Sequence, residues 1–144
     1  MSSIPFHYID LRAFSYVTED EQRVEDALRQ FLPEEFELDR ATSEGHYGDR
    51  ILILSARVEK ARGIRTVLEA IGDLADEEFA RIERELEERV TENCEFFLTL
   101  DKQAAYGGEI ALGDGITLRG KVEAYPAKKE HALDNIEETL SDVS

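Results

Sequence analysis

The chain has 144 residues, of which 42% are hydrophobic and 8% aromatic, enough for the core of one domain spanning residues 1–144 and too many for a disordered chain. It carries 33 acidic and 17 basic residues, a net charge of −16, and a single cysteine, Cys94, which excludes a disulfide or a multi-thiolate metal site within one chain. No apolar run approaches the roughly 18 residues of a membrane span and no secretory signal pattern opens the sequence, so we expect a cytoplasmic protein without membrane contact.

The first half of the chain alternates between strand and helix patterns. Thr18 and Glu21 have the spacing of a capping box at the start of the first helix, and Pro33 ends that helix. The patterns predict a strand at 6–17, a helix at 18–32, a strand at 36–42, a loop at 43–49, a strand at 51–58 and a helix at 60–74.

The second half of the chain continues with the same strand and helix patterns and ends in a predicted helix. It predicts a helix at 76–90, a strand at 94–101, a loop or hairpin at 103–115, a strand at 116–124 and, after Pro126, a helix at 127–140. The order β-α-β-β-α-α-β-β-α predicts the α+β class. We expect one mixed or antiparallel sheet with helices packed on one face.

The acidic residues are spread over several segments, while Lys is scarce. This pattern favours adaptation to molar salt, where the Debye length falls to about 3 Å, over a local acidic patch for a protein partner. Two stretches escape the acidic bias: residues 45–65 have two acidic and five basic residues, and residues 96–129 have four and five. Surfaces that meet a polyanion must keep their bases, so these stretches are candidates for binding nucleic acid. The alternative is that buried strands simply carry few acids.

No catalytic or cofactor-binding motif accompanies these segments. His7, His46 and His131 lack the spacing of metal ligands, and neither a phosphate-binding glycine loop nor a nucleophile elbow is present. We therefore expect a non-enzymatic protein without a cofactor or a metal.

Two signatures in the C-terminal half point to a known family. They are the segments Leu100-Asp101-Lys102-Gln103-Ala104-Ala105-Tyr106-Gly107-Gly108 and Lys121-Val122-Glu123-Ala124-Tyr125-Pro126-Ala127-Lys128-Lys129. Together with Glu44-Gly45-His46-Tyr47-Gly48 and Ile9-Asp10-Leu11-Arg12-Ala13, they resemble archaeal RNA-binding proteins described as predicted exosome subunits. The resemblance implies a fold like that of the ribosomal large-subunit protein that binds five-S ribosomal RNA, and RNA binding without catalysis. With the high acidity, it also suggests a halophilic archaeon.

The expected RNA contacts combine cations, aromatic rings and a glycine-rich loop. Lys128 and Lys129 open the last predicted helix, where free N–H groups favour an anion, although plain solvation is the alternative. Tyr106 and Tyr125 either stack on bases or close the core edge. The candidate site consists of Lys102, Gln103, Tyr106, Arg119, Lys121, Tyr125, Lys128, Lys129, Gly45, His46, Tyr47 and Gly48.

Three hypotheses follow. The first is an RNA-binding protein in RNA processing or degradation, associated with exosome or other ribonucleoprotein subunits. The second is an acidic protein-interaction or scaffold module, and the third is an enzyme acting on a nucleotide-like ligand. For the first, we expect the five bases of residues 96–129 to converge on one patch, and the loop 43–49 to be exposed and mobile.

Overall fold

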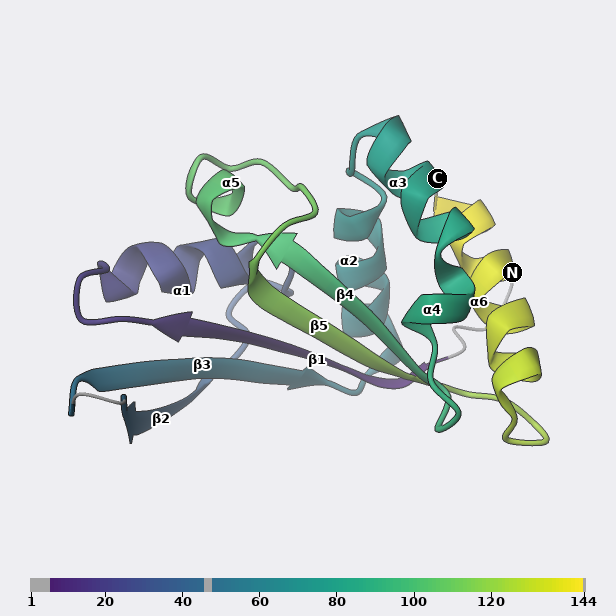
Figure 1. The fold of residues 1–144 in the computed structure, drawn as a ribbon, viewed down its shortest axis with the longest axis horizontal. Helices are drawn as coiled ribbons and strands as arrows, with labels where there is room; N and C mark the ends of the chain where they lie inside the picture. Colours follow the sequence, from purple (N-terminus) through teal and green to yellow (C-terminus); the bar gives the residue numbers. More distant parts are fainter. Residues whose placement is uncertain (1–5, 46–47, 144) are drawn as a thin grey trace.

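Five antiparallel strands form a single sheet in the order β2-β3-β1-β5-β4 (Figure 1). The computed structural model describes residues 6–45 and 48–143. The strands are β1 (Phe6–Ser15), β2 (Asp39–Glu44), β3 (Arg50–Val58), β4 (Glu95–Asp101) and β5 (Gly115–Val122). Within these described residues the helices are α1 (Glu21–Arg29), α2 (Ala61–Ile71), α3 (Asp76–Arg84), α4 (Leu86–Arg89), α5 (Lys102–Tyr106) and α6 (Lys129–Val143). The predicted α+β class is confirmed, and the sheet is purely antiparallel.

The core lies between one face of the sheet and the helices, which gather along one side of it (Figure 1). On β1 the residues Ile9, Leu11 and Ala13 are buried, whereas the intervening Asp10 and Arg12 are not. The same alternation along β3, β4 and β5 makes one face apolar. Helices α1 and α2 contact β1, and α6 contacts β5. None of the helices in the described part of the chain covers the opposite face.

The first helix begins later than the sequence pattern predicts. Its N-cap is Asp20, whose carboxylate accepts a hydrogen bond of 2.9 Å from the backbone N–H of Gln22. The capping box between Thr18 and Glu21 is therefore wrong. The physical reason is the neighbouring residue Glu19. Its carboxylate turns back toward the end of β1 and accepts a hydrogen bond from the backbone N–H of Tyr16, so residues 17–20 form a turn instead of the start of a helix.

Other boundaries also differ from the predictions: the expected helix 76–90 is divided into α3 and α4, and three further differences lie near predicted site residues. Strand β2 starts at Asp39, because residues 30–38 form an irregular segment in which Glu35 has a φ of 58°. The expected loop 103–115 begins as helix α5, which Asp101 caps by accepting from the backbone N–H groups of Gln103 and Ala104. The loop 43–49 is shorter than expected, because Ser43 and Glu44 belong to β2. His46 and Tyr47 lie outside the described residues.

Candidate functional site

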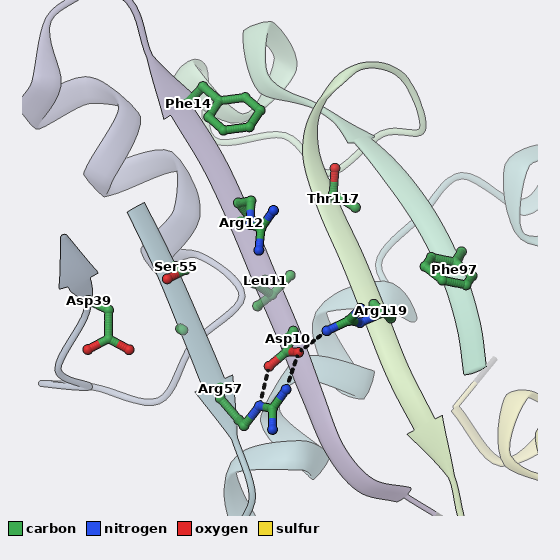
Figure 2. Close-up of a pocket in the computed structure, with 11 residues that line it drawn as sticks. Asp10, Leu11, Arg12, Phe14, Asp39, Ser55, Arg57, Phe97, Thr117 and Arg119 are labelled. Carbon is green, nitrogen blue, oxygen red and sulfur yellow. Dashed lines mark hydrogen bonds and ion pairs between the residues drawn. The ribbon is translucent and has the colours of Figure 1, made fainter. Parts of the chain in front are cut away.

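The helix-free side of the sheet gathers polar and aromatic side chains from all five strands. We call this surface the open face, and define it by the residues whose strand positions alternate with the buried ones. It consists of Tyr8, Asp10, Arg12, Phe14, Asp39, Ala41, Ser43, Ile51, Ile53, Ser55, Arg57, Glu95, Phe97, Thr99, Asp101, Gly115, Thr117, Arg119 and Lys121. Eleven residues centred on β1 line a hollow of about 520 Å³ on this side (Figure 2).

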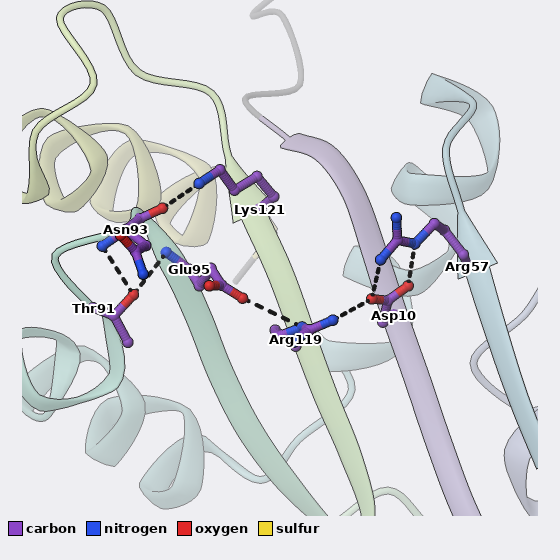
Figure 3. A network of polar contacts seen from close by, with 7 residues as sticks. All are labelled: Asp10, Arg57, Thr91, Asn93, Glu95, Arg119 and Lys121. Carbon is purple, nitrogen blue, oxygen red and sulfur yellow. Dashed lines mark hydrogen bonds and ion pairs between the residues drawn. The ribbon is translucent and has the colours of Figure 1, made fainter. Parts of the chain in front are cut away.

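Asp10 lies at the centre of the open face and holds two arginines. Strand register places it opposite Arg57 of β3 on one side and Arg119 of β5 on the other. Arg57 donates to the two carboxylate oxygens from Nε at 2.8 Å and Nη2 at 2.9 Å, and Arg119 donates from Nη2 at 3.0 Å (Figure 3). The three side chains form one charge-assisted network across the three central strands.

The network extends from Asp10 toward the β4 edge. Arg119 reaches Glu95 with its Nε at 3.3 Å, and Lys121 donates to the backbone carbonyl of Asn93 (Figure 3). The guanidinium of Arg57 also lies over the ring of Tyr8, 3.9 Å from the ring centroid. This stacking and the bidentate contact orient the guanidinium plane and fix it against the sheet.

The hydrogen bonds set the protonation states of this network. Burial raises the pKa of Asp10, but the hydrogen bonds from Arg57 and Arg119 outweigh it and hold that pKa below its ordinary value of 3.8. The hydrogen bond to Asp10 in turn raises the pKa of both arginines. All three groups are therefore charged at neutral pH.

The open face has a charge balance unlike that of the whole chain. It holds four basic residues, Arg12, Arg57, Arg119 and Lys121, and four acidic ones. The whole chain has 17 basic and 33 acidic residues. Arg12 is exposed at the centre of the face and makes no hydrogen bond or ion pair with the residues that the structure describes. An anionic ligand can therefore reach Arg12 without displacing a protein partner.

Aromatic rings flank these charges. Phe14 at the end of β1 is 37% exposed and lies 6.5 Å from the ring of Tyr16, which is 48% exposed. Phe97 of β4 is half-buried at the other side of the hollow (Figure 2). A face with arginines between exposed rings offers phosphate contacts and stacking platforms together.

The sequence-predicted cations do not converge on one patch. Arg119 and Lys121 lie on the open face as expected from the strand period, but Lys102 points into the protein. Its side chain is 9% exposed, and its Nζ donates to the carbonyl of Phe14 at 2.9 Å and to Glu19 at 2.8 Å. Lys102 has these internal partners because its strand-end position faces the β1–α1 turn, and its ammonium group does not lie with Arg119 and Lys121 on the open face.

Tyr106 joins the same internal cluster. Its hydroxyl donates to Glu19 at 2.5 Å, and the guanidinium of Arg23 lies 4.6 Å from its ring centroid. Burial, together with the contact to the Glu19 carboxylate, raises the pKa of Tyr106 to about 12. Of the two alternatives left open for Tyr106, the geometry supports packing at the core edge. Gln103, next to Lys102 on α5, is exposed.

The remaining predicted residues lie at opposite ends of the sheet. Tyr125 is 98% exposed in the connection after β5, followed by exposed Lys128 and half-buried Lys129 at the start of α6. Gly45 and Gly48 form the turn between β2 and β3, at the other end of the sheet, where Gly48 has a φ of 80°. The seven-residue separation of Tyr8 and Ser15 on β1 puts these ends about 23 Å apart.

The residues that sequence reasoning missed are those of β1 and β3 on the open face, above all Asp10, Arg12, Phe14 and Arg57. A signal was present: polar or aromatic residues occupy every second position of β1, between Ile9, Leu11 and Ala13. The same strand period that predicted the core also predicts this second face.

Two further observations bear on the chemistry. Across residues 6–45 and 48–143, no group of three or more His, Cys, Asp or Glu side chains could hold a metal ion. No helix in this described part of the chain has the length and apolarity needed to cross a membrane.

Comparisons with known proteins agree on one family. A family model described as RNA binding matches residues 8–122. The RNA-binding protein PAB1135 of Pyrococcus abyssi is 36% identical over 143 residues, which cover 93% of each chain. The solved structure of the DUF54 protein Mth689 of Methanothermobacter thermautotrophicus is 40% identical with a TM-score of 0.80, over 94% of this chain and 98% of that one. Protein AF2318 of Archaeoglobus fulgidus is 28% identical with a TM-score of 0.83, over 93% and 99%.

Proposed function

The chain belongs to the family described as RNA binding, and from this premise we propose that it binds RNA, without catalysis, through the open face of its sheet. The observation that carries the proposal is the arrangement around Asp10. Arg12, Arg57 and Arg119 come from three adjacent strands onto one helix-free surface, with Phe14 and Phe97 beside them (Figure 2). Guanidinium groups bind phosphate oxygens through paired N–H donors, and exposed rings stack on bases.

The experiment compares two exposed arginines that lie on opposite sides of the sheet. Arg12→Gln removes the unpaired cation of the open face, and Arg65→Gln removes an exposed cation from α2, on the helix side. Both variants change the net charge equally. Binding of labelled RNA is followed by fluorescence anisotropy over a range of KCl concentrations.

We expect Arg12→Gln to weaken RNA binding and to reduce the slope of log K against log salt by about 0.7 to 0.9, the loss of one phosphate contact. Arg65→Gln should leave both quantities close to those of the parent. Equal effects of the two variants would show that only the total charge matters, and the open face would not be the binding site.

We further propose, on the strength of the resemblance, that the RNA contact serves RNA processing or degradation in the cytoplasm, beside exosome or other ribonucleoprotein subunits. Gln103, Tyr125, Lys128 and Lys129, with the 45–48 turn, remain proposed as contacts beyond the ends of the open face. Affinity purification of the tagged protein in molar KCl, with and without ribonuclease, tests the partners: subunits that remain after ribonuclease are held by protein contacts. Loss of all of them would contradict a protein-mediated association.

A further inference from the structure

The aromatic rings of the open face are placed for a ligand that is not part of the chain. Phe14 is 37% exposed, and Phe97 is half-buried and lines the hollow from the other side. Neither ring belongs to the hydrophobic core cluster or packs against it. A phenylalanine side chain in a soluble domain usually contributes its area to the core. Phe14 and Phe97 instead face outward on the same surface of the sheet, so their rings offer apolar area that the core does not bury.

The charges of the open face are too few and too well paired to bind a polyanion alone. Arg57 and Arg119 share Asp10, and Arg119 also contacts Glu95. Double-helical RNA shows a protein mainly its phosphates and 2′-hydroxyls, so its affinity depends on the number of phosphates neutralised. With a net charge of −16 on the chain, that contribution is small, and another interaction must supply the affinity.

Stacking on unpaired bases is such an interaction, because it does not depend on net charge. One ring contact changes affinity by about 5- to 150-fold when the ring is removed. Bases in a duplex already stack on one another about 3.4 Å apart, so their faces are covered. Only a single strand can turn separate bases onto separate rings.

The positions of the two rings fit separate bases. Strand register aligns Phe97 with Arg119 and Asp10, while Phe14 lies four residues further along β1 and two strands away. These offsets correspond to about 10 Å across the sheet and about 13 Å along it, or about 16 Å in total. Arg12 and Thr117 occupy the surface between the rings (Figure 2).

We propose that the ligand of the open face is single-stranded RNA, whose unpaired bases stack on Phe14 and Phe97 while its phosphates pass over Arg12. This inference rests on the proposed RNA-binding function of the same surface. Phe14 and Phe97 supply affinity in a form that salt screens weakly, and Arg12 supplies the phosphate contact.

The test compares one labelled RNA strand alone and annealed to its complement, with the full chain in molar KCl. The single strand should bind at least about tenfold more tightly than the duplex, and Phe14→Leu and Phe97→Leu should each reduce its affinity about fivefold or more. Tyr125→Leu removes a ring that is 98% exposed and lies off the sheet, at the other proposed stacking position, and it should reduce the affinity less than either phenylalanine variant. Phe97→Tyr keeps the ring and should keep the affinity, which separates loss of stacking from loss of folding.

The outcomes separate this inference from the proposed function. If the duplex binds as tightly as the single strand, or if the two leucine variants bind like the parent, single-strand stacking is overturned. The open face stays the binding surface in that case, provided Arg12→Gln still weakens binding. If Tyr125→Leu is the variant that loses affinity, stacking occurs after β5 and the inference fails. If neither RNA form responds to Arg12→Gln, the proposed function fails as well.

Discussion

Lys102 offers the sharpest distinction between a binding residue and a structural one. Its ammonium group has two internal acceptors, the carbonyl of Phe14 and the carboxylate of Glu19, and it lies 5.2 Å from the ring centroid of Tyr16. Lys102→Met keeps most of the apolar stem and removes the charge. The variant should therefore unfold more easily and still bind RNA when folded.

The magnitude follows from the exposure of the pair. The side chains of Lys102 and Glu19 are 9% and 17% exposed, so the ion pair is largely screened from water. Removing one partner of a buried pair costs about 3–5 kcal/mol. Glu19 keeps the Tyr106 hydroxyl and the Tyr16 N–H as donors, so we expect a loss of about 2–3 kcal/mol in the free energy of unfolding. For a chain of this length the midpoint should fall by about 5–10 °C.

Thermal unfolding by circular dichroism and RNA anisotropy at a temperature where both proteins are folded measure the two effects. Lys128→Met changes an exposed lysine of the other family signature, so it is the control and should change the free energy of unfolding by less than about 0.5 kcal/mol. Adding Glu19→Gln to Lys102→Met should cost less than the sum of the single changes, since the pair is then already broken. An unchanged midpoint with a clear loss of RNA affinity would refute the structural role and return Lys102 to the binding site.

Three further predictions concern stability and the central carboxylate. Burial raises the pKa of Glu19, but hydrogen bonds from Lys102 and Tyr106 outweigh this effect and hold the pKa below its ordinary value of 4.5. The pKa of Asp10 likewise lies below its ordinary value of 3.8. Both carboxylates therefore stabilise the fold above pH about 4.5 and lose that contribution as pH falls through the folded-state values; a midpoint that stays constant on acidification would contradict this. The unfolding midpoint should rise between about 0.1 M and about 1 M KCl, where the Debye length shrinks from about 10 Å to about 3 Å; a higher midpoint at low salt would rule out salt adaptation. Asp10→Asn should raise RNA affinity by freeing the two guanidinium groups, at a cost of about 1 kcal/mol in unfolding free energy; weaker RNA binding by the folded variant would mean that Asp10 is needed to position them.

The sequence by itself determined most of the elements and the composition of the core. The two-residue period of β1 and β5 predicts which side chains are buried, and the helical period of α2 does the same, because each period reflects local backbone geometry. Boundaries failed where a distant contact decided them. Glu19 turns back to Lys102, 83 positions away, so α1 starts at a different cap. The five residues of α5 are too few to show a helical period.

Only the tertiary structure decided which strands are neighbours, and the candidate site depends on that. Asp10 meets Arg57, 47 positions later, and Arg119, 109 positions later, because β1 lies between β3 and β5. The charge pattern of the sequence singled out the segments 45–65 and 96–129, which contain the two arginines, but it did not show that they lie side by side. Strand period tells which residues share a face, but pairing of distant strands depends on how the whole core packs, and no local pattern contains that information.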